Sequence, residues 1–190
     1  VGRGWVWQVA TYLFLHGGLM HILFNMLAVW MFGVELERRW GTRAFVTYYF
    51  VTGIGAGLCV VLVSLLPFAA ARASYLVPTI GASGAVYGLL MAWAILFPDR
   101  ILMFMMMFPV PARVYALLMG AIAFYSALGA SGSSTVSHFA HLGGLAAGYL
   151  YLKGPRGPRN LRLEFQYRMT KWRMERMRRK FDVHQGGRVH

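Results

Sequence analysis

The chain has 190 residues, of which 58% are hydrophobic and 13% are charged, and its mean hydropathy is +0.52. An ordinary soluble domain carries roughly 25% charged residues, so this chain has too little polar surface to cover a water-exposed globule. Its net charge of +13 would suggest a nucleic-acid partner if the charge were spread over a soluble fold. The composition therefore excludes a soluble domain. The position of the charge along the chain decides whether a nucleic-acid partner is expected.

Most of the positive charge lies in the last part of the sequence. Residues 153–190 hold twelve of the 19 lysines and arginines and three of the six acidic residues. A basic segment that follows a membrane span stays on the cytoplasmic side. We therefore expect no nucleic-acid partner but an integral membrane protein, in a bacterial cytoplasmic (inner) membrane, with a cytoplasmic C-terminus.

Four long windows contain no charged residue, and they predict an all-α, polytopic membrane helix bundle. We expect five spans, at residues 12–32, 44–66, 83–97, 114–128 and 136–152. Residues 101–108 are apolar but short, which favours an interfacial or re-entrant piece. Five spans place the termini on opposite sides of the membrane, so a cytoplasmic C-terminus puts Val1 outside. Because residues 1–8 do not resemble a signal peptide, a sixth span is expected upstream. The predicted domains are the end of an outer loop (1–11), a transmembrane core (12–152) and a basic tail (153–190).

The tail has two open interpretations. Leu161, Phe165, Met169 and Trp172 recur at helical spacing among cations, which is typical of a basic amphipathic helix on anionic lipid. A solvated extension that only sets the topology fits equally well.

The chain has one cysteine, Cys59, which excludes an intramolecular disulfide and a cysteine-based zinc site, and we expect neither a metal nor another cofactor.

The polar residues inside the predicted spans are the candidates for chemistry, because polar groups in lipid are costly. Ser83 precedes the pair Gly84 and Gly88, and His141 precedes the pair Gly144 and Gly148. Such glycine pairs let two helices approach closely, so the serine and the histidine are expected to meet. A serine hydroxyl within hydrogen-bond reach of an imidazole is an activated nucleophile with its general base.

Further residues complete a predicted hydrolase site. Tyr87 lies one turn after Ser83 and is expected to hold the imidazole by stacking. His21 and Asn25 share one face of their helix, and with the backbone N–H of Ser83 they supply donors for an oxyanion. Gly81 opens the sequence Gly81-Ala-Ser-Gly84 ahead of the third span.

Three motifs in this order resemble the rhomboid intramembrane serine proteases: His21-Ile-Leu-Phe-Asn25, Gly81-Ala-Ser-Gly84 with Tyr87, and Ala140-His141 followed by Gly144 and Gly148. The resemblance covers about residues 5–152. It implies Ser83 as nucleophile, His141 as base and then acid, an oxyanion hole of His21, Asn25 and the Ser83 amide, and Tyr87 packed on His141.

The resemblance also assigns some residues outside the reacting group. Gly33-x-x-x-Glu37 resembles the family's cytoplasmic turn, and His16 matches a family position; structural roles are expected for both. Trp7-Gln8 stands where the family has Trp-Arg, and glutamine lacks the guanidinium's charge and fork. The resemblance begins after the family's first span. This agrees with the sixth span that is expected upstream of the five counted above.

The predicted function is an intramembrane serine endopeptidase that cleaves transmembrane protein substrates through an acyl-enzyme. One alternative is a catalytically silent rhomboid-like scaffold that binds membrane proteins. A second is a metal or proton pathway along His16, His21, His138 and His141, which the lack of an acidic residue in the spans weakens.

Overall fold

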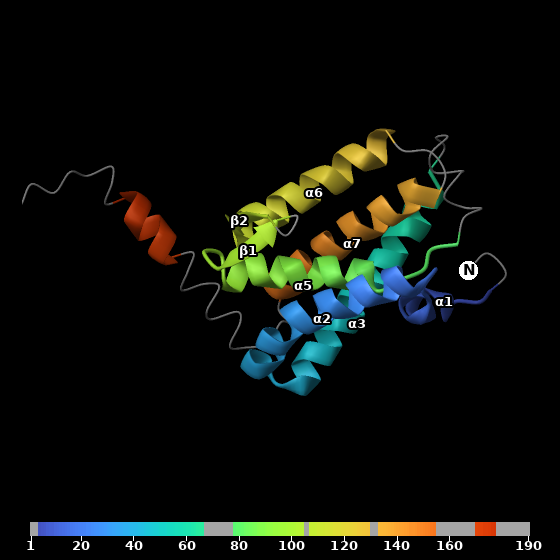
Figure 1. Cartoon of the computed structure of the whole chain (residues 1–190), viewed down its shortest axis with the longest axis horizontal. Helices are drawn as coiled ribbons and strands as arrows, with labels where there is room; N and C mark the ends of the chain where they lie inside the picture. The colour runs from blue at the N-terminus through green and yellow to red at the C-terminus, as the bar shows by residue number, and fades with distance from the viewer. Residues whose placement is uncertain (1–3, 67–77, 105–106, 130–132, 155–169, 178–190) are drawn as a thin grey trace, which may run out of the picture.

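The structure is a computed structural model that describes residues 4–66, 78–104, 107–129, 133–154 and 170–177. The labelled elements of these residues follow one another in the order shown in Figure 1: α1 (Gln8–Thr11), η1 (Tyr12–Phe14), α2 (Leu19–Trp40), α3 (Thr42–Ser64), α5 (Ser83–Leu96), β1 (Ile101–Phe104), β2 (Phe108–Pro111), α6 (Ala112–Gly129) and α7 (Ser133–Lys153). Residues 170–177 form a further helical segment. The predicted helical bundle is therefore confirmed.

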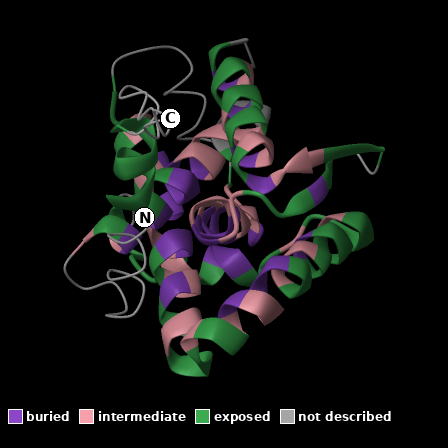
Figure 2. Cartoon of the chain, turned by 90° about the vertical axis from the view of Figure 1, so that its left-hand side faces the viewer, coloured by how far each residue is buried: buried purple, intermediate pink, exposed green. Residues whose placement is uncertain are grey.

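Helix α5 is the centre of the bundle. It is apolar on all sides, as expected for a helix surrounded by others, and most of its residues are buried, among them Ala85, Leu89, Ala92 and Trp93. It contacts α2, α3, α6 and α7, and Figure 2 shows these helices arranged around it. Any group at the first turn of α5 is thus enclosed by neighbouring helices.

The first predicted span begins at the wrong residue. Residues 12–14 form the separate turn η1, and α2 starts only at Leu19. Gly17 and Gly18 interrupt the chain between them, and glycine favours such breaks because its backbone is the least restricted. Helix α2 also continues past residue 32 to Trp40. At the other four predicted spans the structure has the helices α3, α5, α6 and α7.

Among the described residues, two helices are long and apolar enough to cross a membrane, namely α2, with a mean hydropathy of 1.6, and α3, with 1.9. Their residues are mostly not buried inside the protein, so their apolar surface is available to lipid. Helices α5 and α6 are shorter and apolar. Such a set of helices is that of an integral membrane bundle.

Helices α5 and α7 approach each other along their glycines. A Cβ built on Gly144 would overlap the carbonyl group of Gly84, and one on Gly148 would lie 3.2 Å from the carbonyl oxygen of Gly88. The hydroxyl of Tyr48 in α3 donates a hydrogen bond of 2.7 Å to that same Gly88 oxygen. Helices α5 and α7 are therefore packed backbone to backbone near Ser83 and His141, and the Tyr48 side chain joins α3 to them.

Ile101–Phe104 and Phe108–Pro111 form a two-stranded antiparallel sheet, and the expectation of an interfacial or re-entrant piece stays a prediction. Ile101 pairs with Pro111 and Phe104 pairs with Phe108. Short apolar runs do not distinguish a strand from a helix, which is why the sequence left the form of this piece open.

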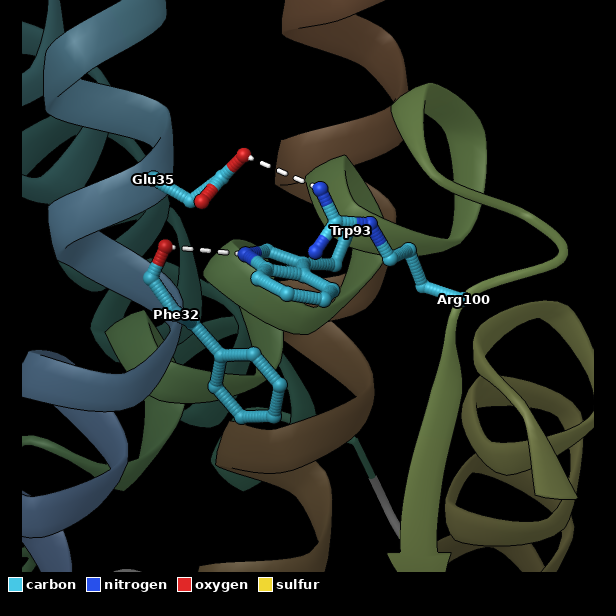
Figure 3. A network of polar contacts seen from close by, with 4 residues as sticks. All are labelled: Phe32, Glu35, Trp93 and Arg100. Carbon is cyan, nitrogen blue, oxygen red and sulfur yellow. Dashed lines mark hydrogen bonds and ion pairs between the residues drawn. The ribbon is translucent and has the colours of Figure 1, made fainter. Parts of the chain in front are cut away.

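A polar network ties the second halves of α2 and α5 together (Figure 3). The indole Nε1 of Trp93 donates a hydrogen bond of 2.9 Å to the carbonyl oxygen of Phe32, and Arg100 pairs with Glu35 at 3.3 Å. The guanidinium groups of Arg39 and Arg100 both lie over the ring of Phe97. These contacts join the second half of α2 to the end of α5 and the residues that follow it.

The predicted amphipathic tail helix lies mostly outside the described residues. Residues 170–177 are helical and exposed, and the guanidinium of Arg176 lies 5.3 Å from the ring centre of Trp172. The choice between a lipid-bound helix and a solvated extension stays open.

Candidate active site

The start of α5 and the middle of α7 bring a hydroxyl and an imidazole together. The Oγ atom of Ser83 lies 2.9 Å from Nε2 of His141, although the two residues are 58 positions apart in the sequence. The glycine contacts between α5 and α7 explain how two helices come close enough for this bond. The predicted pair is adjacent, with the geometry that proton transfer from the hydroxyl to the ring requires.

The imidazole of His141 is held by an aromatic ring. The ring of Tyr87 is parallel to it, with an interplanar angle of 5° and 4.1 Å between the ring centres. His138 approaches the same imidazole edge-on at 6.1 Å. Because the stack fixes the plane of the ring, Nε2 is kept pointing toward Ser83.

His21 has a defined tautomer. Its Nδ1 accepts a hydrogen bond of 3.2 Å from the backbone N–H of Gly17, so in the neutral ring the proton is on Nε2, as inferred from the hydrogen-bond partner. Nε2 lies beside Gly81, where a Cβ would be only 2.6 Å away. The N–H of His21 therefore faces the chain just before Ser83.

Asn25 follows His21 by one helical turn and is buried. Its Nδ2 donates to the carbonyl oxygen of His21 at 2.8 Å and lies 3.8 Å from the position of a Cβ on Gly81. The amide group carries a second N–H. One donor thus holds the side chain against its own helix, and the other is left for the space between α2 and α5.

Gly81 places Ser83 at the first residue of α5. Its φ of +109° lies in the region that side chains rarely adopt, and its N–H donates to the carbonyl oxygen of Tyr12 at 3.0 Å. Helix α5 then begins at Ser83. Since the first N–H groups of a helix have no partner within that helix, the Ser83 amide is a donor at the positive end of the helix dipole.

A cavity of about 420 Å³ joins these groups. It is open to the surface and is lined by residues of α2, α5 and α7, among them His21, Asn25, Ser83, Tyr87 and His141. Every predicted catalytic, oxyanion and stacking side chain thus lines one space. The geometry suits attack by the hydroxyl on a carbonyl group placed in that cavity, with N–H donors beside the developing oxyanion.

The residues expected to be structural lie beside this site or at the far end of α2. The ring of His16 contacts that of His21 edge-on at 5.1 Å, and both of its nitrogens are buried without a hydrogen-bond partner among the described residues. The hydrogen bond predicted for His16 is therefore not formed there. Glu37 accepts a hydrogen bond of 2.7 Å from Thr42 and so bridges α2 and α3.

The predicted metal pathway has no matching cluster in the described part of the chain, where no group of three or more His, Cys, Asp or Glu side chains is placed to hold a metal ion. At the site where the family has Trp-Arg, the ring of Trp7 stacks on that of Trp5, and Gln8 follows. Gln8 is the first residue of α1.

Sequence reasoning missed one polar residue of the cavity. Ser137 lines it together with His141. The two positions are four apart and share one face of α7, so helical spacing from His141 was the signal that could have found it.

Comparison with known proteins agrees with the fold. The model of the Rhomboid domain matches residues 3–154. Rhomboid protein 1 of Saccharomyces cerevisiae mitochondria is 35% identical over 139 residues, which are 73% of this chain and 38% of that protein. The Bacillus subtilis rhomboid protease GluP is 28% identical over 149 residues, 78% of this chain and 26% of that protein.

A third relative is similar in size. The putative rhomboid protease YdcA of Bacillus subtilis is 26% identical over 152 residues, 79% of this chain and 67% of that protein. The chain spans less than two fifths of the length of the first two relatives, and no solved structure matches it. The family match covers the whole helical core, and the chain belongs to the rhomboid family of integral membrane proteins.

Proposed function

We propose that the chain is an intramembrane serine endopeptidase that cleaves transmembrane protein substrates. The observation that carries the proposal is the 2.9 Å distance between Ser83 Oγ and His141 Nε2 within a cavity that also holds N–H donors. The names of GluP and YdcA as proteases support the same reaction class.

In the proposed mechanism, Ser83 Oγ attacks the carbonyl carbon of the scissile bond while His141 Nε2 takes its proton. The negative charge moves to the carbonyl oxygen, next to the N–H groups of His21, Asn25 and Ser83. His141 then gives the proton to the leaving amine, and an acyl-enzyme remains on Ser83. Water activated by the same imidazole hydrolyses the ester and restores the serine.

Tyr87, Gly81, Gly84, Gly144 and Gly148 support this geometry without taking part in the chemistry. The stack on Tyr87 restrains the imidazole, and the glycines leave room for α7 against α5 and for His21 against residue 81. A shift of about 1 Å in a reacting group can cost roughly a hundredfold in rate. We propose that these five residues act as positioning residues.

The orientation is part of the proposal. Arg38, Arg39, Arg43, Arg100 and Arg113 lie in or near the turns that follow α2, α5 and the hairpin, and the tail adds twelve more cations. The positive-inside rule puts this end and the C-terminus in the cytoplasm, in a bacterial inner membrane, with Ser83 toward the outer face. Anionic lipid is the proposed partner of the tail.

A fluorophosphonate probe tests the nucleophile directly. It should label reconstituted protein at Ser83, and both Ser83→Ala and His141→Ala should abolish the label. Ser137→Ala is the matched control, because Ser137 lines the same cavity but has no such bond to the imidazole among the described contacts, and it should keep the label. Folded protein that takes no label would favour the silent scaffold.

Cleavage of a model transmembrane substrate in the same vesicles tests the reaction. Wild-type protein should release both fragments, and Ser83→Ala should release none. Undiminished cleavage by Ser83→Ala would disprove the assignment of the nucleophile.

A further inference from the structure

The hairpin of β1 and β2 has an apolar surface that no other part of the described chain covers. Ile101, Met103, Met107 and Phe108 are each more than half exposed. No polar or charged residue occurs between positions 101 and 112. A hairpin with one face in water would alternate apolar with polar residues, so water is a poor environment for this one.

One face of the hairpin is fixed against the bundle. Leu102 is buried in the main core cluster, and the ring of Phe104 contacts that of Tyr115, which lies in the first turn of α6. The opposite face carries Ile101 and Met103, which are cross-strand partners of Pro111 and Pro109. Phe108 is the partner of Phe104 in the last pair before the turn and shares its face, but it is 57% exposed there. The hairpin is thus anchored next to the end of a membrane helix.

The direction of the hairpin is sideways from the bundle. Figure 2 is viewed nearly along α5, and the two strands extend outward from the helices in the plane of the picture. Because α5 is the central helix of a membrane bundle, this plane runs roughly along the membrane surface. The hairpin therefore lies beside the ends of α5 and α6 instead of projecting far into water.

The free edge of β2 lacks hydrogen-bond donors. Leu102 pairs with Val110, and the N–H of Ala112 donates to the carbonyl oxygen of Arg100 at 2.8 Å, so the N–H groups at even positions point toward β1. Positions 109 and 111, whose nitrogens point outward, are both proline. A lipid-facing edge loses several kcal/mol for each unsatisfied group, and proline removes two of the donors.

Charged residues frame the hairpin only at its base. Arg100 pairs with Glu35, and Arg113 pairs with Asp99. A peptide that added a strand to β2 would need backbone donors that the two prolines do not supply. Exposed apolar residues on α6, such as Leu117, continue the same kind of surface, which favours lipid as its partner.

We propose that the β1–β2 hairpin is a membrane anchor that inserts Ile101, Met103, Met107 and Phe108 into the interface between headgroups and acyl chains. Its partner is the phospholipid leaflet next to the ends of α5 and α6. The hairpin holds these helix ends at a fixed depth in the bilayer. The proposal does not depend on the proteolytic activity.

Spin labels measure this depth. Cys59 is the chain's one cysteine, so a Cys59→Ala background allows a nitroxide to be attached at Met103→Cys or, in a second variant, at Phe108→Cys. Leu117→Cys on α6 is the lipid reference, and Asp99→Cys, whose native side chain is 77% exposed, is the aqueous reference. The protein is reconstituted into phosphatidylethanolamine and phosphatidylglycerol vesicles.

Collisions with oxygen, which concentrates in lipid, are compared with collisions with a water-soluble nickel chelate. Labels at 103 and 108 should favour oxygen, as the label at 117 does, while the label at 99 favours the nickel chelate. Labels at 103 and 108 that behave like the one at 99 would show a water-exposed surface and overturn the proposal. Protection from both reagents would show a protein partner, such as a second copy, and would also overturn it.

Discussion

Gly144 in α7 lies so close to Gly84 in α5 that a single added methyl group would overlap the Gly84 carbonyl. The obstacle is backbone, which cannot turn aside as a side chain does. Gly84 directly follows Ser83, and Gly144 lies about one turn after His141, so the distance between the two helices and the distance between the Ser83 hydroxyl and the His141 imidazole are coupled.

We therefore expect Gly144→Ala to separate α5 from α7. Overpacking of this kind costs about 1–3 kcal/mol of stability, and the bond between Ser83 and His141 should lengthen. Fluorophosphonate labelling should fall at least tenfold while the protein stays folded.

Gly120→Ala is the control for this change. It adds the same methyl group on α6, where the nearest atom is Cδ1 of Leu145 at 3.3 Å, the far end of a flexible side chain. Its labelling rate should be close to that of the unchanged protein. Equal labelling of both variants would show that the glycine contact does not set the site.

Gly81→Ala should displace His21, one of the proposed oxyanion donors. The backbone at this position has a φ of +109°, and the new Cβ would lie 2.6 Å from Nε2 of His21. The imidazole must then move away from the cavity. Loss of one oxyanion donor costs roughly a hundredfold to a thousandfold in turnover, so cleavage of a model substrate should fall by about that factor.

Gly41→Ala separates the backbone effect from the contact. Gly41 also has a positive φ, of +81°, but nothing lies within 4 Å of a Cβ there. Strain of this kind costs about 1–3 kcal/mol, so Gly41→Ala should lower the Tm and leave turnover per folded molecule unchanged. Loss of turnover in both variants would attribute the effect to instability alone.

Tyr87 is expected to act through its ring and not its hydroxyl. The structure places its ring parallel to that of His141, and stacking of this kind contributes about 0.5–1.5 kcal/mol. Tyr87→Phe should keep most of the activity, whereas Tyr87→Leu should lose up to about tenfold. The turnover number at saturating substrate is the measurement, and a loss in Tyr87→Phe equal to that in Tyr87→Leu would implicate the hydroxyl instead.

The sequence predicts the meeting of Ser83 and His141 because each lies beside a glycine pair, and such pairs permit two helices to approach closely. It also predicts that His21 and Asn25 share a face, since they are one turn apart. The tautomer of His21 depends on the N–H of Gly17, which belongs to a turn between η1 and α2. The pair Gly17-Gly18 is a local signal that could have predicted the turn, whereas the tautomer depends on a hydrogen bond that residue spacing does not reveal.

The hairpin and the polar network between α2 and α5 could not be predicted from the sequence for a second reason. Residues 101–111 are apolar in every position, and period-2 alternation has no contrast to reveal a strand. The bond from Trp93 to the carbonyl of Phe32 joins residues 61 positions apart. Such a bond follows from how two helices pack, which residue spacing within one helix does not determine.

The indole of Trp93 forms a buried hydrogen bond between α2, which carries His21, and α5, which carries Ser83. Trp93→Phe keeps an aromatic ring against Phe32, whose ring lies 5.6 Å away, but removes the hydrogen bond to the Phe32 carbonyl. A hydrogen bond of this kind contributes about 0.5–1.5 kcal/mol, and the smaller ring leaves unfilled space. We expect a lower Tm in detergent, followed by circular dichroism, and a reduced rate of labelling at Ser83.

Trp30→Phe makes the same substitution on α2 at a position that is 67% exposed, toward lipid. It should change neither the Tm nor the labelling, since no core contact is lost. A labelling defect in Trp93→Phe that persists at temperatures where both variants are fully folded would mean that the Trp93 hydrogen bond sets the position of α2 along α5. A labelling defect that disappears at those temperatures would mean that Trp93 contributes only to the stability of the fold.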